Sequence, residues 1–294
     1  MTSSVLLGEV PQHGGTPVRF LELPGSGTPI LLVHGVGASL TSWEDIPFRL
    51  NAAGRHVLAA DLLGHGSSGS LGEYTLAANA SMLRQLLDHL GIARVHLVGH
   101  SLGGGVAMQF ASQEPARVSS LTLISSGGLG TDISYSMRAA VLPGAAPVIR
   151  IITHRAITKP MRRIVEWLAA RGVRSRDFNQ RSVETLESLQ HAGRLAAFVG
   201  TLRSVIGLRG QRVTVLDRLD ILDPERLLVI WGARDPMLPV QHGIAIQDLL
   251  PDTRLVVLAE SGHEPHADEP DSIIDEILAH TEEGLPQWSP PFEP

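Results

Sequence analysis

Ser101 lies in a Gly-x-Ser-x-Gly pentapeptide within residues 98–104, Val-Gly-His-Ser-Leu-Gly-Gly. An apolar run at 95–98 precedes the pentapeptide, and a segment of helical character at 106–112 follows it. A serine on such a tight strand-to-helix turn is presented at the end of a strand, where it can act as a nucleophile. The flanking glycines suit the turn because it leaves little room for a Cβ. Taken alone, the pattern also fits an ordinary turn with a helix-capping serine.

A serine nucleophile needs a base to take its proton and a third group to orient the base. Asp235 follows the apolar run 227–231, and His263 follows the apolar run 255–258. The chain order serine, acid, histidine occurs in one known arrangement of such residues. His266 is the nearest rival of His263 for the role of base, and we expect it to hold the loop by hydrogen bonding instead.

The elements that must position these residues form an alternating pattern of strands and helices. Continuous apolar runs of this kind are typical of strands covered on both faces, and their alternation with helices predicts a doubly wound, mostly parallel sheet. Ligands of such sheets bind outside the carboxyl ends of the strands, where each motif lies. The expected strands are 5–10, 18–23, 30–33, 56–60, 95–98, 121–124, 227–231 and 255–258, and the expected core helices are 76–90, 106–112, 240–250 and 272–282.

Together the motifs resemble those of the α/β-hydrolase superfamily, from about Val18 to His280. The matching segments are the pentapeptide at 98–104, His34-Gly35 as an oxyanion loop, the turn 61–68 after the fourth strand, the acid turn 232–239 and the histidine loop 262–266. The resemblance implies the α/β-hydrolase fold, with a helical cap inserted after the sixth strand. No carboxylate follows the strand ending at 125–126 before Asp132, which favours Asp235 as the acid.

The resemblance also implies a role for each residue of the site. Ser101 would be the nucleophile, His263 the general base and acid, and Asp235 the carboxylate that orients the histidine. The backbone N–H groups of Val36 and Leu102 would form the oxyanion hole. Further candidates for substrate contact are His34, Gly35, Gly37, Trp43 and His100. We expect the two histidines to pack around the loops rather than transfer protons, whereas Trp43 fits a wall of the acyl pocket and a core position equally well.

The segment after Gly130 interrupts the alternation. Helical patterns occur at 164–171, 183–191 and 195–208, with no convincing strand. We therefore expect a core of residues 1–130 and 213–284, a helical cap at 131–212 and a proline-rich, extended tail at 285–294. Residues 130–212 hold 13 arginines and one lysine against five acids, a net charge of +9, whereas the rest carries −15. These arginines either recognise an anionic substrate or are solvated. A further alternative is that residues 139–152 contact a lipid interface.

Composition excludes several classes of function. The 294 residues are 43% hydrophobic and 18% charged with a net charge of −6, which predicts a globular protein that does not bind nucleic acid. Because there are no cysteines, disulfides, thiolate metal sites and cysteine nucleophiles are excluded. We expect no transmembrane segment and a cytoplasmic location, since no apolar window is long enough and the N-terminus lacks signal-peptide character. A homo-oligomer is compatible with the sequence.

Neither a cofactor nor a metal is expected. Residues 64–69 match Gly-x-Gly-x-x-Gly literally, but 70–74 continue as loop, whereas a dinucleotide site needs a helix to begin within the motif. The 13 histidines show no pair at helical ligand spacing with a nearby carboxylate.

Serine as the nucleophile narrows the expected chemistry to acyl transfer, most simply hydrolysis of a carboxylic ester of small or medium size. One alternative is hydrolysis of a carbon–carbon bond, as in the meta-cleavage-product hydrolases. Residues 125–130 partly resemble the loop that those enzymes carry after the corresponding strand. A biosynthetic acyltransferase or lyase on the same scaffold is a second alternative. The sequence leaves the substrate open.

Overall fold

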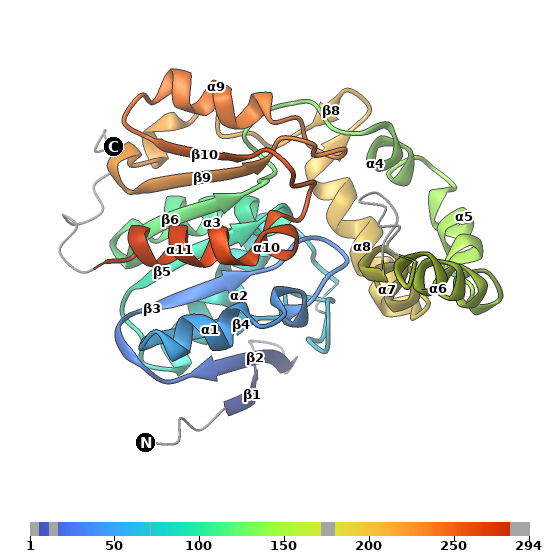
Figure 1. The fold of residues 1–294 in the computed structure, drawn as a ribbon, viewed down its shortest axis with the longest axis horizontal. Helices are drawn as coiled ribbons and strands as arrows, with labels where there is room; N and C mark the ends of the chain where they lie inside the picture. Colours follow the sequence, from blue (N-terminus) through green and yellow to red (C-terminus); the bar gives the residue numbers. More distant parts are fainter. Residues whose placement is uncertain (1–5, 12–16, 71, 172–179, 283–294) are drawn as a thin grey trace.

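The computed structural model describes residues 6–11, 17–70, 72–171 and 180–282, and the expected tail at 285–294 lies outside them. One eight-stranded sheet dominates the fold, in the order β1-β2-β4-β3-β5-β6-β9-β10 (Figure 1). Only the pairs β1–β2 and β2–β4 are antiparallel, so the predicted mostly parallel sheet is confirmed. The strands are β1 Leu6–Pro11, β2 Pro17–Leu23, β3 Ser26–Val33, β4 Arg55–Ala60, β5 Val95–His100, β6 Val118–Ile124, β9 Leu227–Gly232 and β10 Arg254–Leu258.

Two apolar cores lie on the two faces of the sheet. Successive residues of a strand point to opposite faces, so Leu31 and Val33 join one core while Ile30 and Leu32 join the other. The first core is covered by α2 (Leu76–His89), α3 (Leu102–Gln113) and α9 (Gln241–Leu249). The second is covered by α1 (Ile46–Ala52) and α11 (Pro270–His280). Burial on both faces explains why the central strands are continuous apolar runs rather than alternating ones.

Five helices connect β6 to β9, and we call residues 131–212 the insert. They lie beyond the carboxyl ends of the strands (Figure 1). The helices are α4 Tyr135–Ala140, α5 Ala145–Ile152, α6 Arg155–Ala169, α7 Gln180–Ser188 and α8 Ala192–Val205.

The expectation that the insert holds no strand was wrong in one detail. A short antiparallel pair, β7 (Ile206–Gly207) and β8 (Gly210–Gln211), follows α8 and ends that helix three residues earlier than the periodicity predicted. Gly210 has a φ of 126°, a conformation that glycine adopts without strain, and this permits the tight connection. Two-residue strands leave no periodic signal for the sequence to show.

Two short helices were also missed, α1 in the second core and α10 (Pro265–Asp268) after the histidine loop. Both begin with a proline in the first turn, which is a common start for a helix. Within the described residues, no helix has both the length and the apolar character needed to span a membrane.

Candidate active site

Ser101 occupies the turn between β5 and α3 in a strained conformation, with φ 52° and ψ −116°. Its N–H donates to the carbonyl of Ile124 over 3.0 Å, and its carbonyl accepts from the N–H groups of Gly104 and Gly127. A non-glycine residue in this region of φ persists only where the surroundings hold it there. These three backbone bonds therefore present the side chain at the carboxyl end of β5.

The glycines around Ser101 are required by close backbone contacts. A Cβ at Gly103 would lie 2.1 Å from the carbonyl oxygen of Val33, and a Cβ at Gly99 would lie 2.5 Å from that of Gly103. Backbone atoms at these distances cannot rotate away as a side chain can. At Gly105, by contrast, the nearest atoms are the methyls of Leu76 at 3.5 Å, an ordinary contact.

We expect Gly103→Ala to destabilise the fold by about 3 kcal/mol or more, because β3 would have to move away from α3. Gly105→Ala is the matched control on the same helix and should keep or slightly raise stability, since alanine favours a helix over glycine. Chemical denaturation of both variants checks this. A Gly103→Ala protein as stable as the unmodified one would contradict the close approach of the two backbones.

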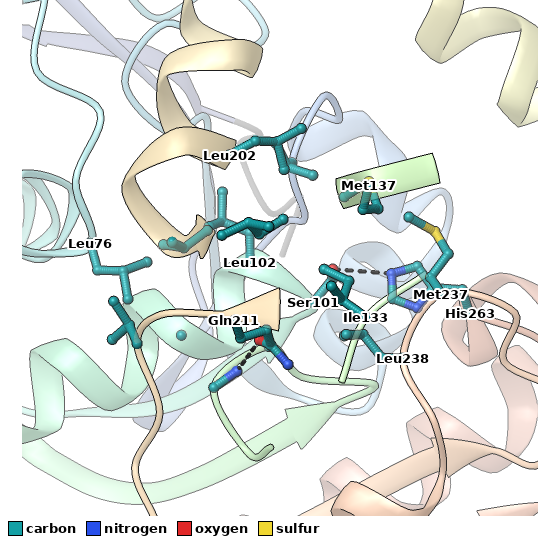
Figure 2. A pocket seen from close by; sticks show the side chains of 17 residues that line it. Leu76, Ser101, Leu102, Ile133, Met137, Leu202, Gln211, Met237, Leu238 and His263 are labelled. Atoms are coloured by element: carbon teal, nitrogen blue, oxygen red, sulfur yellow. Dashed lines mark hydrogen bonds between the residues drawn. The ribbon is translucent and has the colours of Figure 1, made fainter. Parts of the chain in front are cut away.

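Ser101, His263 and Asp235 form a continuous hydrogen-bonded series. Nδ1–H of His263 donates to Oδ2 of Asp235 over 2.8 Å. Oγ–H of Ser101 donates to Nε2 of His263 over 3.0 Å, a bond that Figure 2 shows. Asp235 is an acceptor only, so it holds the proton of the imidazole on Nδ1 and leaves the lone pair on Nε2 facing the hydroxyl. This is the arrangement in which the histidine can take the serine proton.

Asp235 is itself fixed in place. Its side chain is fully buried, and its Oδ1 accepts from the N–H groups of Met237 and Leu238 over 2.7 and 2.9 Å. The histidine loop, residues 262–266, is also held by a side chain: Oδ2 of Asp268 accepts from the N–H of Gly262 over 2.9 Å. Asp268 was not anticipated from the sequence, because only the folded loop brings it to Gly262.

The two residues expected to supply the oxyanion hole lie in the wall of one cavity. Val36 and Leu102 both line the cavity that contains Ser101. Leu102 is the first residue of α3, so its N–H has no acceptor within the helix, and the helix N-terminus favours negative charge. Gly35 allows the close approach, since a Cβ there would lie 3.3 Å from Cβ of Ser101.

His34 holds the loop that carries Val36, and it contacts no described cavity. Its Nε2 accepts from the N–H of Leu62 over 3.0 Å, and its Nδ1–H donates to the carbonyl of Gly35 over 2.8 Å. Burial lowers the pKa of His34 to about 4, so the ring is neutral at pH 7. Both ring nitrogens of His34 thus bind backbone groups, which leaves neither of them facing the cavities at Ser101. The sequence could not show these two bonds.

Asp61 joins the same loops from the fourth strand. It is completely buried and accepts from the N–H groups of Leu40 and Ser67 over 2.7 and 2.8 Å, while Arg19 lies 3.8 Å away. The motif at 61–68 is therefore a structural connection between the oxyanion loop and the turn after β4. The Gly-x-Gly-x-x-Gly match within it closes as a loop, with the N–H of Gly64 donating to the carbonyl of Gly69.

His100 lies beside the histidine loop. Its Nε2–H donates to the carbonyl of His263 over 2.8 Å, and its ring packs against the rings of His263 and His266 at 5.1 and 4.4 Å between centroids. His100 also lines the outer cavity described below. Trp43 is fully buried in the second core, 4.8 Å from the ring of His266, and it lines no described cavity. Trp43 is thus a core residue here rather than a wall of the substrate pocket.

Two cavities meet at Ser101 and His263. The outer one, about 530 Å³, lies between the strand ends and helices α4, α7 and α8 of the insert, with Gly35, His100, Met137 and Leu186 in its wall. The inner one, about 50 Å³, is almost entirely apolar (Figure 2). Its wall includes residues the sequence did not single out, namely Leu76, Ile133, Met137, Leu202, Val205, Gln211, Met237 and Leu238.

Gln211 supports the inner cavity through the backbone, because its Oε1 accepts from the N–H of Gly128 over 2.7 Å. Gly37 lines a third, polar cavity with Arg19 and Arg194. Among the described residues that line the inner and the outer cavity, none is arginine or lysine.

A comparison with protein families finds that residues 28–270 match the family described as the alpha/beta hydrolase fold. The chain belongs to the α/β-hydrolase fold family. An uncharacterized protein of Mycobacterium tuberculosis is 38% identical to this α/β hydrolase over 261 residues, which is 87% of this chain and 76% of that protein.

Two further relatives of this α/β hydrolase have named activities. The 2-hydroxy-6-oxo-6-phenylhexa-2,4-dienoate hydrolase of Burkholderia cepacia is 28% identical over 252 residues, covering 81% of this chain and 82% of that one. The solved structure of an esterase from Exiguobacterium antarcticum superposes with a TM-score of 0.71 at 20% identity, covering 94% of this chain and 99% of that one. At this identity, the likeness to the esterase structure shows that the two proteins have the same fold.

Proposed function

We propose that this α/β hydrolase cleaves a carboxylic ester with an uncharged acyl group, through an acyl-enzyme formed on Ser101. The hydrogen-bonded series Ser101–His263–Asp235, open to an apolar inner cavity, is the observation that carries the proposal. In this proposal the insert acts as a cap, because its helices form part of the wall of the outer cavity.

The reaction follows from the geometry. Oγ of Ser101 attacks the ester carbonyl while Nε2 of His263 takes its proton, and the N–H groups of Val36 and Leu102 bind the oxyanion. The imidazolium then gives that proton to the leaving alkoxide, and the alcohol departs. A water, deprotonated by the same nitrogen, attacks the acyl-enzyme and releases the acid. Asp235 stabilises the imidazolium in both halves of the reaction.

Carbon–carbon hydrolysis is the second candidate, since the relative from Burkholderia cepacia acts on a dienoate. A dienoate carries a carboxylate, and burying an anion calls for a cationic partner or several hydrogen-bond donors. The described walls of the two cavities contain no arginine or lysine. This lining favours an uncharged substrate.

The size of the inner cavity predicts a preference for short acyl groups. A volume of about 50 Å³ leaves room for an acyl chain of only a few carbons. We expect kcat/KM for p-nitrophenyl esters to be highest for such short acyl chains, and to fall for octanoate and longer esters. A protein that hydrolyses none of these esters but cleaves a dienoate would overturn the proposed function.

Gly105→Ala sharpens this test because Gly105 lines the inner cavity beside Leu76, whose side chain lies away from His263 (Figure 2). The added methyl narrows the cavity without touching the reacting groups. We therefore expect the variant to keep its rate on acetate and to lose about tenfold in kcat/KM on hexanoate, since one or two methylenes are worth about 1–2 kcal/mol in a pocket of this kind. An equal loss on both esters would place the acyl group elsewhere.

A further inference from the structure

Helices α5 and α6 expose large apolar side chains to solvent. Ile151 is 64% exposed, Ile164 56% and Trp167 54%, with Val148, Ile152 and Ile157 also exposed. The two helices lie at one edge of the molecule, away from the eight-stranded sheet (Figure 1). Exposed apolar residues are normal when scattered singly, whereas a group of them on adjacent helices marks an interaction surface. We call residues 148–171 of this pair the α5–α6 face.

The exposed stripe on α6 is not the side that the helix uses for packing. Val165 and Thr158 are buried, and α6 packs on α7. Ile157, Ile164 and Trp167 follow one another at the spacing of seven and three residues, so they share a different side of the helix. One side of α6 packs against the fold, and a second apolar side therefore remains exposed to solvent.

Positive charge lies at the edge of the stripe, at Arg163, and on the opposite, polar side of the helix, at Arg155 and Lys159. Six basic residues and one acid, Glu166, occur between 145 and 171. Within the described part of the chain, no ion pair involves Arg150, Arg155, Lys159 or Arg163, whereas Arg162 pairs with Glu184 and Glu187. The guanidinium of Arg171 stacks 3.8 Å over the ring of Trp167, at the end of the stripe.

We propose that the α5–α6 face binds the surface of an anionic lipid bilayer. An apolar stripe with a tryptophan, with arginine at its edge and arginine and lysine on the polar side, matches a helix that lies in the membrane interface: the apolar side chains enter the acyl boundary and the cations bind headgroup phosphates. The alternative occupant, a second copy of this chain, would bring the cations of two identical faces together. Charge complementarity therefore favours the bilayer over self-association.

Binding in this way places the outer cavity close to the lipid. Helix α7, on which α6 packs, supplies Ser182, Thr185 and Leu186 to the wall of that cavity. The cavity is thus one helix away from the bound surface. An ester that partitions into a membrane would be concentrated near the site, although binding itself does not depend on turnover.

Co-sedimentation with vesicles tests the proposal. We expect the full chain to bind vesicles of 70% phosphatidylcholine and 30% phosphatidylglycerol at least tenfold more tightly than pure phosphatidylcholine, with binding lost at high salt. Replacing Arg155, Lys159 and Arg163 by glutamine should weaken binding to the anionic vesicles by tenfold or more, because each charge contributes about fivefold. Ile164→Ser with Trp167→Ser should have a similar effect.

The matched control is Ile244→Ser with Leu249→Ser, which removes two exposed apolar residues from α9. It should bind vesicles as the unmodified chain does. Absence of binding to anionic vesicles would overturn the proposal, as would equal loss in the α9 control. Self-association in solution that the Ile164→Ser/Trp167→Ser variant abolishes, without vesicle binding, would identify the face as a dimer interface instead.

Discussion

Ser101→Ala is expected to abolish ester hydrolysis, with a loss of about 10⁶-fold in kcat and little change in stability. The hydroxyl is the only group removed, and alanine keeps a Cβ on a turn whose φ of 52° is already imposed by three backbone hydrogen bonds. His263 then has no proton to accept. Initial rates with p-nitrophenyl butyrate and a thermal melt of both proteins check the two parts of the expectation.

Covalent labelling separates a lost nucleophile from a damaged site. A fluorophosphonate should add one adduct to the unmodified chain, at Ser101, and none to Ser101→Ala. Asp235→Asn is the informative companion, because the amide would donate to Nδ1 and reverse the tautomer of His263, which costs about 10⁴-fold in related geometries. Labelling at Ser125 or Ser126 instead of Ser101 would overturn the assignment of the nucleophile.

The meeting of the three residues of the proposed triad could be predicted because each follows a strand. Ser101, Asp235 and His263 lie within five residues of the ends of β5, β9 and β10, and parallel strands bring their carboxyl ends to one edge of the sheet. Strand order and distances were not needed to infer that they meet. Their local patterns, two tight glycine turns and one Gly-His-x-Pro loop, were enough.

The walls of the cavities could not be predicted in the same way. Ile133, Leu202, Gln211 and Met237 come from separate loops and helices, and only the packing of the insert brings them together. His34 shows the reverse difficulty. It sits in the matching motif, yet its two nitrogens bind backbone groups, and no sequence pattern distinguishes a buried structural histidine from one that faces substrate.

Burial of neutral histidines also predicts how stability changes with pH. Burial lowers the pKa of His34 and His65 to about 4 and that of His96 to about 3, and it lowers the pKa of His100 well below its usual value. In the unfolded chain each of these groups titrates near 6.5. Their contribution to stability is therefore fully present above pH 6.5 and is lost as the pH falls toward their folded pKa values.

The sign follows from proton binding, because between pH 6.5 and 4 the unfolded chain holds more protons than the native one. At pH 5.5 the difference approaches four protons, so the free energy of unfolding should fall by several kcal/mol per pH unit, at about 1.4 kcal/mol per proton. Burial raises the pKa of Asp61, which acts in the opposite direction but involves one group only. We expect the protein to unfold cooperatively before pH 4.

Urea denaturation at pH 7.5, 6.5, 5.5 and 5.0 measures this slope, and His96 provides the variants that test its cause. His96→Gln removes one titrating ring and should reduce the slope by close to one proton. Ser120→Ala breaks the 2.8 Å hydrogen bond to Nδ1 of His96 but keeps the ring, so it should lower stability at every pH without flattening the slope. A free energy of unfolding that stays constant between pH 7.5 and 5.0 would show that burial does not lower the pKa of these histidines, and that their rings are charged in the native protein at pH 5.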